Sequence, residues 1–272
     1  MHTRSSSLPR ATLVAITATL VAASPLAAQR QPDFQWAGAL AAGRRVRIQN
    51  VNGDISVSPS TSGKVEVAGT RHGRGRDADQ LTAQVNETSD GIVVCVVWKD
   101  SDDSCDDRGS RHHGDREDWN DASMDLDVRV PANVEVSAGS VSGDVRMVGA
   151  QGRVRANSVS GDVHLERLRA SSVTAHSVSG DIDASIEALT GDGDLSFTTV
   201  SGDVTLELPR DLNADLSMRS VSGELNSDFQ VTLKMTLNGR MDRRSLLARI
   251  GQGGRALEVT TVSGDVRLKI AR

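Results

Sequence analysis

Aromatic side chains are scarce in this sequence, which has no tyrosine, three tryptophans and three phenylalanines in 272 residues. A chain this poor in rings is badly suited to gripping sugars or nucleobases by stacking. Its apolar residues are mostly Val, Leu, Ala and Ile. Because these side chains are small, we expect a core made of many short units that stack on one another.

Cysteine is also rare, and the only two are Cys95 and Cys105. The sequence has no Cys-x-x-Cys motif, so a metal site or a catalytic thiol has little support. In an oxidising compartment the pattern favours a disulfide that closes a loop of about ten residues.

Long apolar runs are missing after the N-terminus. "MHTRSSSLPR" is basic, "ATLVAITATLVAA" is apolar and "SPLAAQ" is rich in small residues. This order is typical of a secretory signal peptide, which we place at 1–28 with cleavage after Ala28. No Cys stands at the cleavage site, so a lipid anchor is not indicated, and no later run is long enough for a transmembrane helix. We expect an extracytoplasmic protein, in the periplasm, at the cell surface or secreted.

Positive charge is in deficit. The predicted signal peptide holds two arginines and no acids, so the remaining chain has 29 Lys and Arg against 36 Asp and Glu. A net acidic chain is a poor partner for nucleic acid, whose binding depends on basic surface.

What the sequence does contain is a repeat. The stretch "SVSGDV" or a close variant occurs seven times, and from the second copy onward its glycines are 18, 19, 22, 21 and 41 residues apart. A constant spacing near 20 residues is typical of a stacked repeat fold. The seven glycines are Gly53, Gly143, Gly161, Gly180, Gly202, Gly223 and Gly264.

Apolar residues alternate on both sides of each copy. In the third copy they are Val154, Ala156, Val163 and Leu165. This two-residue period indicates strands, and the two arms are out of phase by one residue. We therefore expect a bend at Ser158, whose hydroxyl can bond nearby backbone groups.

The phase also assigns a side to each motif residue. We place Val159 in the core beside Val163, and Gly161 at a narrow interior point where the backbone curves or approaches the opposite wall. Ser160 and Asp162 then face solvent.

The predicted fold is all-β: a β-solenoid, or β-helix-like stack, of rungs of about 20 residues with an N-terminal β-hairpin region. A two-sheet β-sandwich is the alternative. The N-terminal β region spans 29–130 and the strand repeat 131–272, although 29–272 could be one continuous domain. One copy is missing between Gly223 and Gly264, where we expect a degenerate rung or an outward hairpin.

The motif acids form a column if the rungs stack. Carboxylates about 5 Å apart repel one another by about 1 kcal/mol in water. Calcium bridging would relieve the repulsion. The simpler interpretation is that each acid is solvated, bonds a backbone group or meets an arginine such as Arg146 or Arg267. The calcium hypothesis assigns these ligands: Asp144, Asp162, Asp181, Asp203 and Glu224.

Two other polar segments are interpreted as solvent-exposed loops without a binding site. The loop 99–123 is acidic and contains His112 and His113, but its spacing matches no defined metal site. The basic segment 71–76 is interpreted as a charged hairpin tip. A catalytic serine is disfavoured because an active site needs one activated hydroxyl, not seven equivalent ones.

These elements together resemble the bacterial "putative adhesin" family, a domain-of-unknown-function group built from repeated β-strands. The resemblance rests on "VRIQNVNGDISV", the run of "SVSGD[VI]" copies and the closing "IGQGGRALEVTTVSGDVRL", and covers roughly 36–272. It implies a secreted or surface-associated protein and brings no catalytic residues.

We expect a non-enzymatic adhesin or cell-envelope scaffold without a cofactor, whose partner is an envelope polysaccharide or protein. A polysaccharide-binding module is the second interpretation, and a polysaccharide lyase or hydrolase the third.

Overall fold

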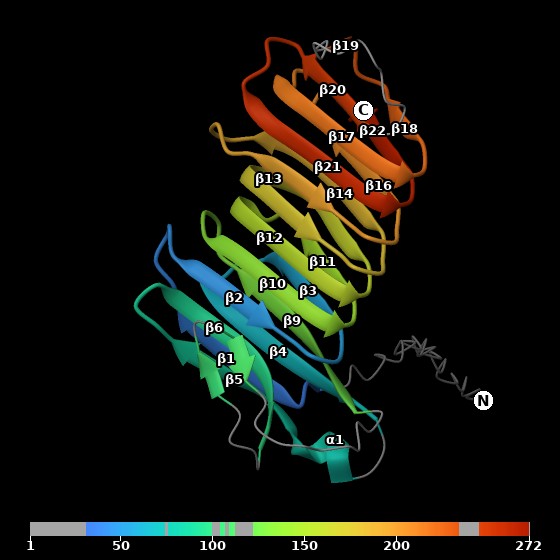
Figure 1. Ribbon diagram of the computed structural model, residues 1–272. Helices are drawn as coiled ribbons and strands as arrows, with labels where there is room; N and C mark the ends of the chain where they lie inside the picture. Colours follow the sequence, from blue (N-terminus) through green and yellow to red (C-terminus); the bar gives the residue numbers. More distant parts are fainter. Residues whose placement is uncertain are drawn as a thin grey trace, which may run out of the picture. The chain divides into compact units, whose positions relative to one another are not determined.

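The computed structural model describes residues 31–73, 76–99, 104–106, 109–111, 122–233 and 245–271. The predicted signal peptide lies outside these ranges, as do His112 and His113 and most of the loop 99–123. Residues Pro32–Arg272 form one compact unit, and the account that follows concerns that unit (Figure 1).

Most of the described unit is β-strand, arranged in two stacks between which the chain passes back and forth. In the first stack, the strands in spatial order are β5 (Leu81–Glu87), β6 (Gly91–Trp98), β2 (Arg45–Gln49), β10 (Glu135–Ser142), β12 (Gln151–Ser160), the second half of β13 (Val163–His176), β15 (Leu195–Thr198), β21 (Arg255–Ser263), β17 (Ala214–Ser222), β20 (Ser245–Ile250) and β19 (Val231–Leu233).

The second stack follows the same order of rungs. Its strands are β1 (Phe34–Ala39), β4 (Lys64–His72), β9 (Ser123–Val130), β3 (Ile55–Pro59), β11 (Val145–Val148), the first half of β13, β14 (Ile182–Leu189), β16 (Val204–Leu208), β22 (Val266–Ile270) and β18 (Leu225–Ser227). The short helix α1 (Arg76–Gln80) and the hairpin β7 (Ser104–Asp106) and β8 (Gly109–Arg111) complete the described elements.

Each motif copy joins one strand of the first stack to one strand of the second, and we call this strand–corner–strand unit a rung. Neighbouring rungs pair in parallel and in register, so that Val136 lies beside Val154 and Val145 beside Val163. The prediction of an all-β solenoid is therefore confirmed.

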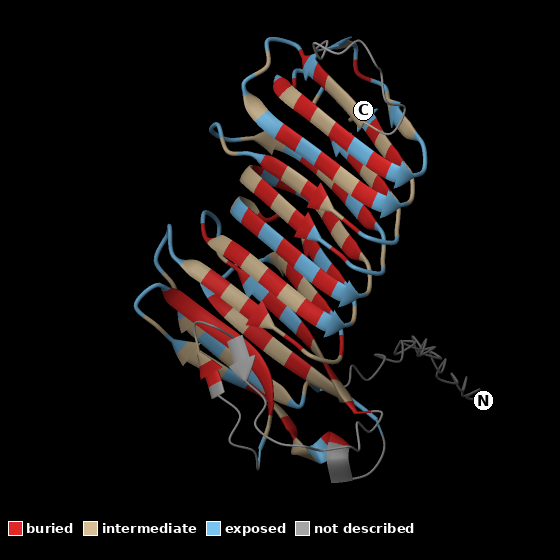
Figure 2. Cartoon of the chain, viewed as in Figure 1, coloured by how far each residue is buried: buried red, intermediate tan, exposed pale blue. Residues whose placement is uncertain are grey.

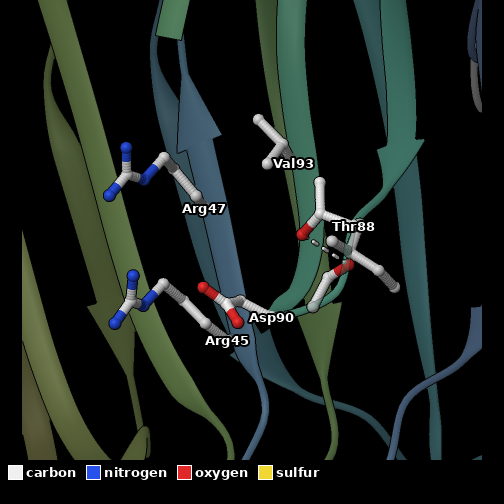
Figure 3. A pocket seen from close by; sticks show the side chains of 7 residues that line it. Arg45, Arg47, Thr88, Asp90 and Val93 are labelled. Atoms are coloured by element: carbon white, nitrogen blue, oxygen red, sulfur yellow. Dashed lines mark hydrogen bonds between the residues drawn. The ribbon is translucent and has the colours of Figure 1, made fainter. Parts of the chain in front are cut away.

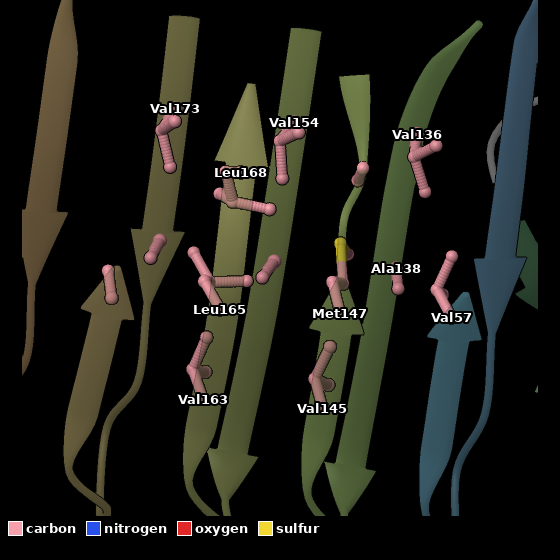
Figure 4. Close-up of a cluster of buried hydrophobic side chains, with 14 of the residues drawn as sticks. Val57, Val136, Ala138, Val145, Met147, Val154, Val163, Leu165, Leu168 and Val173 are labelled. Atoms are coloured by element: carbon pink, nitrogen blue, oxygen red, sulfur yellow. The ribbon is translucent and has the colours of Figure 1, made fainter. Parts of the chain in front are cut away.

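The core lies between the two stacks. Side chains alternate between buried and accessible along most strands (Figure 2), and the inward ones form apolar ladders (Figure 4). The exception is β6, which is buried on both faces because the cluster around Cys95 and Cys105 covers its outer side. Val154, Ala156 and Val163 have no exposed surface, and Leu165 is 1% exposed. Burying a Val or Leu side chain contributes about 1.5–3 kcal/mol. A single rung cannot bury these side chains by itself, so its stability depends on the neighbouring rungs that cover them.

The rungs do not stack in chain order. β21 pairs with β15 on one side and with β17 on the other, and β22 lies likewise between β16 and β18. The last motif copy therefore lies between the fifth and the sixth. The longer spacing before the last copy therefore leaves no gap in the stack, because β21 and β22 fill the position between the fifth and sixth copies. β20 pairs antiparallel with β17 beyond the last rung.

Candidate functional site

The residue before each motif Val lies inside the corner. These seven side chains are 1–5% exposed: Asn50, Ser140, Ser158, Ser177, Thr199, Ser220 and Thr261. Each hydroxyl donates to the motif glycine carbonyl of the neighbouring rung, as from Ser158 Oγ to Gly143 O at 2.9 Å and from Ser177 Oγ to Gly161 O at 3.0 Å. A buried hydroxyl needs such a partner, so this residue ties adjacent rungs together.

The motif Val faces the opposite way from our prediction. Val159 is 44% exposed, and its equivalents Val141, Val178, Val200, Val221 and Val262 are 43–56% exposed. Val154, Ala156 and Ser158 all point inward, so the alternation of the first strand continues through Ser158. It is interrupted at residues 159–162 and resumes at Val163. The hydroxyl's bond to a backbone carbonyl lets a polar residue occupy the inward position and leaves the Val outside.

The motif glycine makes a close contact, but with a different partner from the one expected. A Cβ atom added to Gly161 would lie 2.3 Å from the carbonyl oxygen of Gly143 on the neighbouring rung, and one added to Gly180 would lie 2.2 Å from that of Gly161. The glycine is needed because neighbouring backbones approach here, not because the opposite wall does.

The motif acids form an unbroken ladder. The backbone N–H of Asp162 donates to Asp144 Oδ1, and that of Asp181 donates to Asp162 Oδ1, both at 2.8 Å. The complete order along the column is Asp125, Asp54, Asp144, Asp162, Asp181, Asp203, Asp265 and Glu224. The backbone N–H groups partly offset the repulsion between carboxylates.

Arg267 adds positive charge to the ladder. Its guanidinium contacts Asp203 at 2.9 Å and Asp265 at 2.5 Å. The N–H of Asp265 and then the Arg267 guanidinium lower the pKa of Asp203, because both stabilise its ionised form. Arg146 does not take this role and pairs with Glu166 instead.

One part of the ladder brings three ligand atoms together. Asp144, Asp162 and His164 each offer one atom, and these atoms lie within 4.8 Å of one another. His164 also lies 3.6 Å from Asp183, whose pKa is raised chiefly by burial and lowered in part by His164. Calcium binding by the predicted acids stays a prediction.

Cys95 and Cys105 are bonded to each other. Together with Val93 and Val97 they form a small buried cluster on the outer side of β6. The disulfide fixes β7 against the first stack, where the Asn86 side chain also donates to the Cys105 carbonyl.

The outer faces of the two stacks differ in charge. On the second stack, opposite charges alternate and pair, as in Arg146 with Glu166 and Arg129 with Glu66. On the first stack, four arginines project from β2 and β12: Arg45, Arg47, Arg153 and Arg155. We call these four the basic face, which was not recognised from the sequence. The signal is "RVRI" and "RVRA" at the same repeat position, but its meaning depends on knowing which strands are neighbours.

A shallow depression lies at the end of the basic face (Figure 3). Its volume is about 30 Å³, roughly the share of one water molecule in the liquid. Arg45 and Arg47 extend from the same side of β2, with Asp90 next to Arg45. Arg45 also pairs with Glu135 at 3.4 Å, so part of its charge is compensated.

Comparison with protein families matches residues 43–269 to the family described as Toastrack DUF4097. The chain belongs to this family. No curated protein matches it. Among solved structures, it is similar to a "putative cell adhesion protein" from Clostridium sporogenes (10% identity, TM-score 0.48, covering 89% of this chain and 100% of that one). It is also similar to a "putative adhesin" from Bacteroides fragilis (13% identity, TM-score 0.30, covering 89% and 99%).

Membership of the Toastrack family agrees with the resemblance inferred from the repeated motif, and that prediction is confirmed. Within the described ranges, no helix combines the length and the apolar character needed to cross a membrane.

Proposed function

We propose that this Toastrack protein is a non-enzymatic extracytoplasmic binding protein that acts as an adhesin or as a scaffold in the cell envelope. The predicted signal peptide at 1–28 supports the compartment. The adhesin names of structurally similar proteins agree with this role but do not carry the proposal.

The observation that carries the proposal is how the repeated polar groups are used. The hydroxyl before the motif Val donates to a glycine carbonyl, and the motif aspartates accept backbone N–H groups. A nucleophile needs a base that takes its proton, and a hydroxyl that donates to a carbonyl has none. The polar column is thus structural, and the long outer faces are left for binding.

The test uses purified protein, a panel of envelope polysaccharides and an isolated envelope fraction. Saturable binding without new reducing ends or unsaturated products is the expected result. Release of such products would overturn the non-enzymatic proposal in favour of a lyase or hydrolase. Absence of binding to every polysaccharide and to the envelope fraction would overturn the binding role.

A further inference from the structure

The basic face concentrates positive charge on a chain that is acidic overall. Arg45 and Arg47 lie two residues apart on β2, as do Arg153 and Arg155 on β12. The Cα atoms of each pair are therefore about 6.6 Å apart along the strand. β10 lies between the two strands and presents Ser137 between Arg47 and Arg155. The Cα atoms of Arg47 and Arg155 are therefore about 9.6 Å apart across the sheet.

Compensation of these charges is uneven. Glu135 and Asp90 lie at the Arg45 end. Arg153 and Arg155 are exposed, and neither has an ion-pair partner in the part of the chain that the structure describes. Between the two arginine strands, β10 presents Glu135, which pairs with Arg45, and then the small residues Ser137 and Gly139.

Short polar side chains continue the face toward the later rungs. Arg155 lies beside Thr174, which lies beside Ser196, while Asn157 lies beside His176 and then Thr198. These groups can donate to and accept from sugar hydroxyls. Arginine guanidinium groups bind planar carboxylates through two parallel hydrogen bonds.

We propose that the basic face binds a polysaccharide that carries carboxylate groups, with Arg47, Arg153 and Arg155 as charged contacts and the neighbouring hydroxyl residues as contacts to the sugar rings. This inference rests on the proposed binding function and names its surface and ligand class. Charge and hydrogen bonds supply the recognition, because the chain has too few aromatic residues for stacking.

The same surface fits other polyanions less well. Membrane insertion calls for large apolar side chains, and the exposed valines lie at the corner, not on this face. Single-stranded nucleic acid is bound largely by stacking its bases on aromatic side chains, of which this chain has few.

The test measures the affinity of the purified protein for polygalacturonate at low salt. The double variant Arg153→Gln and Arg155→Gln is compared with Arg129→Gln and Arg146→Gln, which removes the same charge from exposed positions on the opposite stack. We expect the first variant to lose at least about tenfold in affinity, equivalent to 1.4 kcal/mol, and the control to stay within about twofold. Unchanged melting temperatures would show that both variants are folded.

Equal losses in the two double variants would overturn the proposal, since only bulk charge would then matter. Equally tight binding to polyphosphate or to phosphatidylglycerol vesicles would overturn the choice of a carboxylate polysaccharide. If the unaltered protein ignores polygalacturonate but binds the envelope fraction, this inference fails while the proposed function stands.

Discussion

The smallest side chains have the strictest positions in this fold. At the motif glycine, two backbones approach so closely that no Cβ atom fits. Three residues before the glycine, the hydroxyl of the Ser or Thr donates to the same carbonyl of the neighbouring rung. The motif letters are therefore explained by contacts between rungs, and each copy is constrained by the next.

Replacing Gly161 with Ala should destabilise the protein by about 1–3 kcal/mol, the usual range for overpacking. The added methyl group would lie 2.3 Å from the Gly143 carbonyl oxygen, which belongs to backbone and cannot rotate away. Gly139→Ala is the control, because its Cβ would meet nothing closer than 3.9 Å. Urea unfolding measures both, and an equal effect of the two substitutions would contradict the contact.

At the scale of strands, the sequence revealed the inward ladder but not the order of rungs. The alternation around Val154 and Val163 identified the core positions correctly, since a two-residue period states directly which side chains share a face. It failed at Val159, because periodicity does not show that a buried hydroxyl can be satisfied by the next rung. The position of the last rung depends on pairing between distant segments, about which local pattern says nothing.

The rung order can be tested with paired cysteines. Ser196 lies directly beside Glu258 and two strands away from Ser217. The substitutions Ser196→Cys and Glu258→Cys should give a second disulfide under mild oxidation, because paired strands lie about 4.8 Å apart. Ser196→Cys with Ser217→Cys should not, since about 9.6 Å separates those strands. Peptide mapping by mass spectrometry distinguishes the outcomes, and the reverse result would restore stacking in chain order.

Over the whole molecule, the acidic ladder raises the question of whether the column needs a cation. Every aspartate of the ladder already accepts a neighbouring backbone N–H, and Arg267 neutralises part of one end. We therefore expect EDTA to leave the melting temperature unchanged. The comparison samples are the protein in magnesium-free buffer without EDTA and the same protein with added calcium. A clear fall with EDTA that calcium reverses would instead support the predicted calcium ladder.

The candidate binding face was hidden from sequence reasoning for a similar reason. Arg47 and Arg155 are more than one hundred residues apart in the chain but only two strands apart in the stack. The calculation of net charge correctly described the whole chain as acidic and concealed this local excess. Only parallel stacking in register converts two short basic strands into one surface.

His176 offers a pH-dependent test of ligand binding at that surface. Burial, and then the nearby Arg155 charge, lower the pKa of His176. Its paired neighbours Asn157 and Thr198 are uncharged. A bound carboxylate polymer would offset Arg155 and raise this pKa, so by linkage its affinity should increase as the pH falls through the range in which His176 becomes protonated. NMR titration of the imidazole with and without polygalacturonate measures the shift, with His164 on the opposite stack as the internal control. Bound polymer that leaves the His176 titration unchanged, or shifts both histidines alike, would place the ligand elsewhere.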